Sequence, residues 1–205
     1  MNYLLIIAGL PATGKTSFAR YLSGKMGIPM VSKDIVKEHL FDTVGFKSRS
    51  EKVALGLAAM DLMYYFARAL LEAGKPLILE NNFEDISKPG LLKLIETFNC
   101  KTVSIRFHTE MKVLAERFLR RDRSPERHRG HVIDTQYPEV NGKEALNTET
   151  QIKNFADYYD RMKQRGMEFF SIGGDEIVID TTDFSAVSYE SIFGKIMEKI
   201  AAWGE

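Results

Sequence analysis

The chain has 205 residues, which suits one α/β domain with a small inserted segment and allows a sizeable core. Its 28 Lys and Arg residues balance its 28 Asp and Glu residues, so no overall positive charge argues for nonspecific nucleic-acid binding. The single cysteine, Cys100, excludes an internal disulfide and fits a reducing compartment. No apolar run reaches about 18 residues, and no basic leader precedes the apolar start, so we expect a cytoplasmic protein without a membrane span.

The apolar pattern of the first half predicts strands that alternate with helices. Strands are expected at residues 3–8, 28–32 and 75–81, and helices at 16–23, 33–41 and 48–72. Ser48 and Glu51 have the spacing of a capping box at the start of the long helix, and Gly74 ends it. The apolar face of this helix is expected to comprise Val53, Leu57, Met60, Tyr64, Ala67 and Leu71.

The second half continues the alternation. Strands are expected at residues 102–107 and 176–180, with helices at 87–99, from Thr109 onward, and at 188–203. Met111, Leu114 and Phe118 are expected to face inward, and Thr148 with Gln151 predicts a further capped helix containing Ile152, Phe155, Tyr159 and Met162. Strands that alternate with helices predict a parallel sheet covered on both faces.

The segment from Gly9 to Thr16, GLPATGKT, fits the phosphate-loop pattern, and it stands between a predicted buried strand and a predicted helix as that pattern requires. Gly9 and Gly14 allow a tight turn, which points backbone N–H groups and the helix N-terminus at one anion. Lys15, which we expect to face solvent in the empty loop, would reach the β- and γ-phosphates of ATP, and the Thr16 hydroxyl would bind Mg²⁺. The predicted nucleotide contacts in this segment are Gly9, Pro11, Ala12, Thr13, Gly14, Lys15, Thr16 and Ser17.

Asp34 directly follows the predicted second strand. Ligands of open parallel sheets gather beyond the carboxyl ends of the strands, where the phosphate loop also lies. Asp34 is therefore expected to accept the proton of a hydroxyl group as phosphate arrives, as the catalytic-loop aspartate does in protein kinases. Two alternatives stay open: Asp34 binds Mg²⁺ through water, or it is a helix N-cap.

Glu80 closes the apolar third strand, in the manner of the magnesium-supporting carboxylate of phosphate-loop enzymes. Glutamate is longer than the usual aspartate, which speaks against direct coordination of the metal. A polar strand end that enters a turn explains the residue equally well. Asn82 and Glu84 are weaker candidates for hydrogen bonds to a hydroxylated substrate. We therefore assign Asp34, Glu80 and Asn82 to the substrate, and Thr16 and Glu80 to the metal.

Six arginines stand within residues 117–129: Arg117, Arg120, Arg121, Arg123, Arg127 and Arg129. Arg117 and Arg121 are four residues apart on a predicted helix, so they should leave the same face. Guanidinium groups suit phosphate binding and base stacking, so residues 117–142 are expected to be a mobile lid with few apolar anchors, which closes over ATP. A solvated charge run that pairs with Asp122 and Glu126 accounts for two or three of the six.

Two further groups carry weaker signals. His128, His131 and Asp134 lack further strong ligands, so we expect no zinc site. The segment from Asp180 to Asp183 follows the last strand, where its backbone is a candidate contact for the adenine edge, although a simple turn explains it as well.

Together these residues resemble the P-loop kinases of the AAA-like predicted-kinase group, whose relatives include chloramphenicol phosphotransferase, zeta toxins and the kinase domain of polynucleotide kinase. The resemblance runs from Tyr3 to the region of Trp203. It is carried by residues 9–16, 32–34, 79–83, the arginine helix and residues 178–182.

The resemblance implies a P-loop three-layer α/β sandwich, with a five-stranded parallel sheet in the order 2-3-1-4-5. Helices cover both faces, and residues 1–205 form one domain that includes the arginine-rich lid. The resemblance also implies ATP-dependent phosphorylation of a hydroxyl group with Asp34 as the base. By similarity to the lid helices of nucleoside monophosphate kinases, Arg117 would stack near adenine and Arg121 would touch phosphates. Glu80 departs from the group, in which many relatives carry aspartate.

The expected function is phosphoryl transfer from ATP, with Mg²⁺, to a hydroxyl of a small molecule, with Lys15, Asp34 and Arg121 as catalytic residues. A 5′-hydroxyl polynucleotide kinase is a second interpretation, against which the neutral net charge speaks. A nucleotide-dependent switch or binding module without an acceptor is a third, although Asp34 and the arginine lid favour catalysis. Neither the acceptor nor the oligomeric state follows from the sequence.

Overall fold

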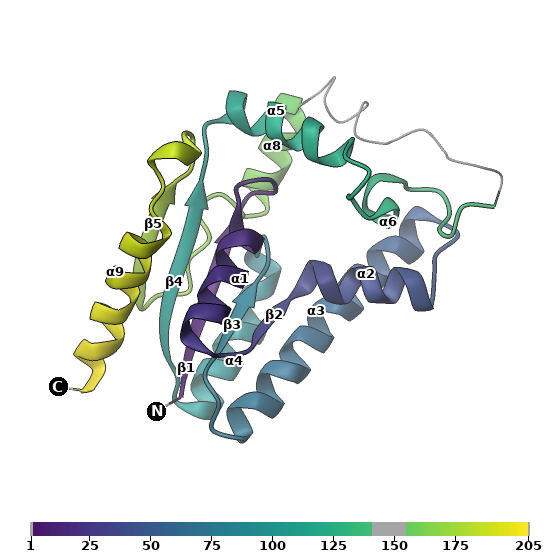
Figure 1. The fold of residues 1–205 in the computed structure, drawn as a ribbon. Coiled ribbons are helices and arrows are strands. Elements are labelled where there is room, and N and C mark those ends of the chain that lie inside the picture. The colour runs from purple at the N-terminus through teal and green to yellow at the C-terminus, as the bar shows by residue number, and fades with distance from the viewer. Residues whose placement is uncertain (1, 141–154, 205) are drawn as a thin grey trace.

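The computed structural model describes residues 2–140 and 155–204, and within them five parallel strands form one sheet in the order β2-β3-β1-β4-β5 (Figure 1). This confirms the predicted sheet order. The strands are β1 (Tyr3–Gly9), β2 (Met30–Ser32), β3 (Leu77–Glu80), β4 (Lys101–His108) and β5 (Asp175–Asp180).

Helices cover both faces of the sheet, α1 and α9 on one face and α3 and α4 on the other. The predicted capping box at Thr148 and Gln151, with Ile152, lies outside the described residues. The helices are α1 (Lys15–Met26), α2 (Lys33–Thr43), α3 (Arg49–Glu72), α4 (Lys88–Phe98), α5 (Met111–Asp122), α6 (Arg129–Val132), α8 (Phe155–Gln164) and α9 (Tyr189–Ala201). Three short 3₁₀ turns complete the elements: η1 (Asp85–Ser87), η2 (Phe184–Ala186) and η3 (Ala202–Gly204).

Strand β1 shows why the sheet is central. Leu5 and Ile7 pack with the α1 and α9 side chains, while Leu4 and Ile6 pack with those of α3 and α4. All four side chains are fully buried. A strand buried on both faces is an unbroken apolar run, which is the pattern of a central parallel strand.

The register brings the functional segments to one edge of the sheet. Glu80, the last residue of β3, stands opposite both Ile7 of β1 and Ser32 of β2. The phosphate loop leaves β1 two residues later, and Asp34 follows β2 directly. The start of β1 and the end of α9 lie at the opposite edge, as Figure 1 shows.

The predicted apolar face of α3 is wrong in its first half. Val53 and Leu57 are 49% and 51% exposed, whereas Lys52 and Gly56 are buried. The reason is that this half packs against α2 and residues 131–134 rather than against the sheet: Lys52 hydrogen-bonds to the latter, and Gly56 lies against Lys37 of α2. Periodicity alone cannot register such a packing partner.

The second half of α3 follows the prediction. Ala67 and Leu71 are buried, and Met60 and Tyr64 are partly buried against the same cluster. In α5, Leu114 and Phe118 are buried as expected. Met111, the first residue of the helix, is 44% exposed.

Helix α3 is the one helix within the described ranges that is long and apolar enough to cross a membrane, by length and composition only. Core helices of globular domains pass the same test. Met63, Ala67 and Leu71 of α3 pack against β1 and β3 in the core of the sheet, so we interpret α3 as a core helix.

Candidate active site

The phosphate loop has a backbone that only glycine tolerates at two positions. Gly9 and Gly14 have φ angles of 133° and 92°. A Cβ at Gly9 would lie 2.3 Å from the Phe107 carbonyl oxygen, and one at Gly14 would lie 2.8 Å from the Phe184 ring. Ala12 is also left-handed, with a φ of 66°. The loop is therefore held in an uncommon conformation, of the kind whose successive N–H groups form an anion-binding concavity.

Side chains of the loop stabilise its shape. The Thr13 hydroxyl and the Lys15 ammonium both donate to the Leu10 carbonyl, at 2.8 and 2.7 Å. The Thr181 hydroxyl, at the end of β5, donates to the Thr13 carbonyl at 3.1 Å. The expectation that Lys15 faces solvent is wrong, because only 5% of it is exposed. Burial lowers the pKa of Lys15 to about 8, against the opposing effect of Glu80 and Asp34.

Glu80 faces the start of α1 from the end of β3. Its carboxylate accepts a hydrogen bond from the Ser32 hydroxyl at 2.6 Å. Burial raises the pKa of Glu80, and Lys15 and Ser32 oppose that rise. Ser32 is the N-cap residue of α2, yet its side chain makes no capping bond and is instead used by Glu80. Sequence reasoning did not assign Ser32 to the site, since only the β2–β3 register reveals the pair.

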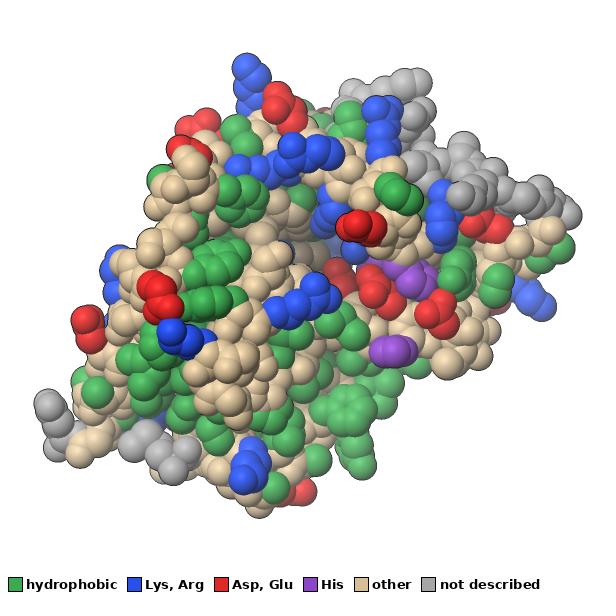
Figure 2. Space-filling model, in the orientation of Figure 1, with side chains coloured by type: hydrophobic (Ala, Val, Ile, Leu, Met, Phe, Trp, Pro, Cys, Tyr) green, Lys and Arg blue, Asp and Glu red, His purple; other side chains and the backbone are tan. Residues whose placement is uncertain are grey.

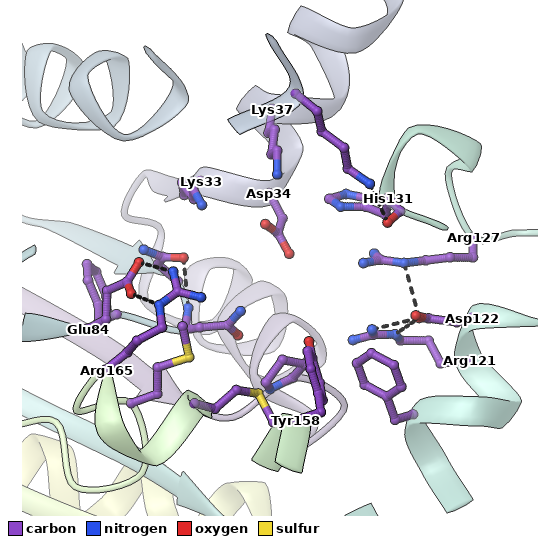
Figure 3. A pocket seen from close by; sticks show the side chains of 18 of the residues that line it. Lys33, Asp34, Lys37, Glu84, Arg121, Asp122, Arg127, His131, Tyr158 and Arg165 are labelled. Carbon is purple, nitrogen blue, oxygen red and sulfur yellow. Dashed lines mark hydrogen bonds and ion pairs between the residues drawn. The ribbon is translucent and has the colours of Figure 1, made fainter. Parts of the chain in front are cut away.

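A cavity of about 240 Å³ lies between the loop, α2, α3, α5, α8 and the segment after β3. Pro11 of the loop, Asn82 and Phe118 contribute to its walls. Its charged side chains, most of which Figure 3 labels, are Lys33, Asp34, Lys37, Arg49, Lys52, Glu84, Arg121, Asp122, Arg127 and Arg165.

Asp34 lies in the middle of this charged group (Figure 3). It is not the N-cap of α2, which is Ser32, but stands in the first turn of that helix. Burial works to raise the pKa of Asp34, but His131, Lys33 and nearby cations outweigh it and hold that pKa well below the usual range. The carboxylate is therefore ionised at neutral pH and free to accept a proton or a hydrogen bond.

His131 approaches Asp34 from the far side of the cavity (Figure 3). Its Nε2 lies 2.9 Å from a Glu38 carboxylate oxygen. Burial lowers the pKa of His131, so the ring is mainly neutral at pH 7. Histidine and acidic side chains meet where α6 faces α2, as Figure 2 shows. The sequence suggested His131 only as a weak metal ligand, and its distance from Asp34 in the chain hid their proximity.

Arg117 and Arg121 are separated by the structure. Arg121 lines the cavity and pairs with Asp122 at 2.6 Å. Arg117 is not part of that wall: its guanidinium stacks on Phe184 at 3.8 Å from the ring centre and donates to the Thr181 and Thr182 carbonyls. Arg117 thus lies at the segment named as a candidate adenine contact and Arg121 at the cavity, and their roles toward adenine and the phosphates stay predictions.

The other arginines differ in exposure. Arg120 and Arg123 are exposed, in agreement with the interpretation of part of the run as a solvated surface. Arg129 pairs with Glu139. Arg127 faces the cavity and lies 3.5 Å from Asp122 and 3.8 Å from Glu38.

The segment after α5 has more apolar anchors than expected. Ile133 is buried in a cluster with Phe41 and Phe46, and Gly130 packs so closely that a Cβ there would lie 2.4 Å from the Phe41 ring. Lys52 of α3 donates hydrogen bonds to the carbonyls of His131 and Ile133. The described part of the predicted lid is therefore docked on α2 and α3, and its mobility stays a prediction.

The weaker candidates after β3 differ in their surroundings. The backbone carbonyl of Asn82 accepts a hydrogen bond from the Gly9 N–H at 3.5 Å, and Asn82 borders the cavity. Glu84 is paired with Arg165, with 2.7 Å between Oε1 and Nη2, so its carboxylate is already engaged. In residues 2–140 and 155–204 no group of three His, Cys, Asp or Glu side chains is arranged to hold a metal ion.

Comparison with known proteins places this geometry in a family. The model of a family described as an AAA domain matches residues 4–141. None of the curated proteins matches the chain. Among solved structures, a candidate kinase from Chloroflexus aurantiacus j-10-fl shares 23% identity over 98% of this chain and 97% of that one, with a TM-score of 0.72.

Two further structures share the fold at lower identity. A sugar kinase from Janibacter sp. HTCC2649 is 11% identical over 98% and 95% of the two chains, with a TM-score of 0.55. A gluconokinase from Sinorhizobium meliloti 1021 is 13% identical over 98% and 93%, with a TM-score of 0.52. The sheet order, the loop between β1 and α1 and the family match agree: the chain belongs to the AAA domain family and has the P-loop α/β fold.

Proposed function

We propose that the protein is a kinase that transfers the γ-phosphate of ATP, with Mg²⁺, to a hydroxyl group of a small molecule. The observation that carries this proposal is the position of Asp34. Its ionised carboxylate faces a cavity whose wall includes the phosphate loop and several cations. A nucleotide switch has no need of a carboxylate at that place, whereas a phosphotransferase uses one to receive the proton of the acceptor.

The loop residues fit a nucleotide triphosphate. The left-handed backbone at Ala12 and Gly14 and the free N–H groups at the start of α1 form an anion-binding concavity. Lys15 would bind the β- and γ-phosphates after leaving the Leu10 carbonyl. Bound ATP supplies the transferable phosphoryl group, and Mg²⁺ supplies positive charge that offsets the phosphates. The Thr16 hydroxyl and the Glu80 carboxylate are the oxygen groups suited to Mg²⁺.

In the proposed reaction the acceptor oxygen forms a bond to the γ-phosphorus, and the bond between that phosphorus and the β–γ bridging oxygen breaks. ADP leaves with the bridging oxygen. The hydroxyl proton passes to the Asp34 carboxylate and then to solvent. Arg121, which lines the cavity beside Asp34, would offset charge on the transferred group.

The size of the cavity supports a small acceptor. Its volume of about 240 Å³ is below the range of roughly 300–1,000 Å³ typical for drug-sized ligands. The kinase names of the structures with the same fold agree with phosphoryl transfer, and two of them name sugar or gluconate as substrate. The buried Cys100 thiol fits a cytoplasmic setting.

ATP turnover tests the proposal. We expect ADP release that depends on an added hydroxyl compound and on Mg²⁺, measured against a panel of sugars, sugar acids, polyols and 5′-hydroxyl oligonucleotides. Lys15→Met and Asp34→Asn should both remove the acceptor-dependent part. Tight ATP binding with no turnover for any acceptor class would favour a nucleotide switch, and turnover with oligonucleotides alone would identify a polynucleotide kinase.

A further inference from the structure

The cavity carries more positive charge than the proposed reaction requires. Seven Lys and Arg side chains line it, against three carboxylates: Asp34, Glu84 and Asp122. Burying like charges together is costly unless a partner offsets them. Some of the seven have partners within the protein, so the question is which cations lack one.

Four of the cations are engaged in ion pairs that stabilise the walls. Lys52 binds Asp134 at 2.9 Å together with two carbonyls, and Arg49 pairs with the same carboxylate. Arg165 is bound to Glu84, and Arg121 to Asp122. The pairs of Lys52 and Arg49 join α3 to the segment after α6. The pair of Arg165 joins the end of α8 to the segment after β3, and the pair of Arg121 with Asp122 lies within the last turn of α5. These ion pairs stabilise the walls of the cavity, and their cations already have a carboxylate partner.

Three cations have no such complete pairing. Lys33 and Lys37 make no salt bridge to any carboxylate in the part of the chain that the structure describes. Arg127 forms two long ion pairs, to Asp122 at 3.5 Å and to Glu38 at 3.8 Å, and within the described residues its buried Nε makes no hydrogen bond.

The surroundings of Lys37 hold its ammonium at the cavity. Its side chain runs past Gly56, where a Cβ would lie 3.4 Å from its Cε and Nζ, and its ammonium lies 5.2 Å from the centre of the Phe41 ring. Burial, followed by the charge of Lys33, lowers the pKa of Lys37 to about 8, so the group is still mainly protonated at pH 7. Gly56 therefore leaves room for a charged side chain whose nearby negative charge, Asp34, lies beyond salt-bridge distance.

These cations surround Asp34 rather than the phosphate loop. In Figure 3, Lys33 and Lys37 approach Asp34 from α2, and Arg127 approaches from the opposite wall. Lys33 and Lys37 stand on the same helix as Asp34, within one turn of it. Nucleotide phosphates have their own donors in the loop and in Lys15. A group bound between Lys33, Lys37 and Arg127 therefore belongs to the acceptor.

We propose, building on the kinase function above, that the acceptor is an anionic small molecule: a hydroxyl compound that carries a phosphate or carboxylate group bound by Lys33, Lys37 and Arg127. Its hydroxyl lies at Asp34, and its anionic group lies one helical turn away. Neutral sugars and polyols lack the group that these cations need, so the site rejects them. Lysine and arginine side chains bind both phosphate and carboxylate, and the two sources are separated by experiment.

The arrangement also links acceptor binding to the strength of the base. Lys33, Lys37 and Arg127 are among the groups that depress the pKa of Asp34. An anion bound to them offsets their charge, so the pKa of Asp34 rises toward its ordinary value and the carboxylate takes a proton more readily.

Binding of fragment anions tests this inference separately from the kinase function. The protein is first saturated with a non-hydrolysable ATP analogue and Mg²⁺, which fills the phosphate sites of the loop, and inorganic phosphate or acetate is then titrated by calorimetry. We expect at least one of the two anions to bind, and a Lys33→Met/Lys37→Met double variant to weaken that binding by about tenfold or more. Glycerol, the neutral control, should not bind.

Two matched variants guard against a folding artefact. The single variant Lys37→Arg, in which Lys33 is unchanged, should keep most of the wild-type anion affinity, because arginine keeps the charge. Lys75→Met removes an exposed lysine at the opposite edge of the sheet and should leave anion affinity unchanged. The affinity for the ATP analogue should be the same in all variants.

The outcomes are distinguishable. If the analogue itself does not bind, the kinase function is wrong. If the analogue binds but neither anion does, or if the double variant binds the anion as well as wild type, the anionic acceptor is wrong while the kinase function stands. Turnover of glycerol in preference to glycerol 3-phosphate and glycerate, or of oligonucleotides in preference to all three, would also overturn it.

Discussion

The Ser32 hydroxyl donates a 2.6 Å hydrogen bond to the Glu80 carboxylate, and this bond joins the ends of β2 and β3 directly behind the phosphate loop. One Glu80 oxygen is thus held in place, and Lys15 and Thr16 are near enough to the carboxylate to oppose the rise of its pKa. Asp34 stands two residues beyond Ser32. The bond therefore sets the relative positions of the proposed metal-supporting carboxylate and the proposed base.

Replacement of Glu80 tests its role at the metal. We expect Glu80→Gln to reduce the apparent Mg²⁺ affinity in ATP turnover by about tenfold or more, because the amide keeps the Ser32 hydrogen bond but loses the charge. The measurement is a Mg²⁺ titration at saturating ATP. Glu80→Asp keeps the charge on a shorter side chain, so its apparent Mg²⁺ affinity should lie between those of wild type and Glu80→Gln. An unchanged Mg²⁺ dependence in Glu80→Gln would leave Glu80 as a structural strand end.

Replacement of Lys15 separates binding from stability. Lys15→Met should remove ATP turnover, because the charge on the β- and γ-phosphates is lost. The free energy of unfolding should change by no more than about 1 kcal/mol, since the Leu10 carbonyl keeps the hydrogen bond from Thr13. Turnover assays and urea unfolding provide the two values. Near-normal turnover with unchanged ATP affinity would contradict the assignment of the loop.

The affinity for ATP should depend on pH through the same lysine. The pKa of Lys15 in the empty loop is about 8, below its ordinary value, so the ammonium form is complete only at lower pH. ATP affinity should therefore be constant below about pH 7 and should fall as the pH rises through 8, because binding then requires uptake of a proton. Calorimetry across this range checks the slope, and Lys15→Met should bind weakly with no slope in the same range.

Asp34→Asn should separate nucleotide binding from chemistry. The amide has the same size but cannot take a proton, so acceptor-dependent turnover should fall by about 10²–10⁴-fold. A loose transition state would reduce this loss. The free energy of unfolding at neutral pH should also fall, because the cations that hold the pKa of Asp34 low lose their counter-charge, so unchanged affinity for the nucleotide is the control for an intact site. A rate within about threefold of wild type would direct the search for the base to Glu80.

Lys52 should control the order of the segment after α6. Lys52→Met leaves the carbonyls of His131 and Ile133 without their common donor, at a cost of about 1–3 kcal/mol. Hydrogen exchange at residues 130–137 should accelerate in the variant while exchange in β1 stays slow. Addition of an ATP analogue should restore part of the protection if residues 117–142 act as a lid, and equal protection with and without the analogue would count against one.

The two faces of α3 should respond differently to truncation. Met63→Ala removes a fully buried side chain and should lower the free energy of unfolding by about 2–5 kcal/mol. Leu57→Ala, at a position 51% exposed, should change it by no more than about 0.5 kcal/mol. Chemical unfolding of both variants checks the orientation of the helix. A large loss in Leu57→Ala would restore the face expected from periodicity.

The sequence by itself determined the phosphate loop and the sheet edge at which the site lies. The loop could be recognised from residues 9–16 and their two flanking elements, because its sequence pattern is local in the chain. Asp34 and Glu80 could be assigned to the same edge because both follow apolar runs, and parallel strands bring their carboxyl ends together. The sheet order came from the family resemblance, and the structure has the same order.

Only the tertiary structure decided how these residues are paired and buried. Lys15 proved buried, and Arg127 and His131 proved to face Asp34 from a segment more than 90 residues further along the chain. The first half of α3 turned Lys52 and Gly56 inward because its neighbours there are α2 and residues 131–134. The periodicity of a sequence reports how polar a helix face is but not what that face packs against. Exposure, ion pairing and the absence of a salt bridge at Lys33 and Lys37 are therefore decided only when distant elements meet.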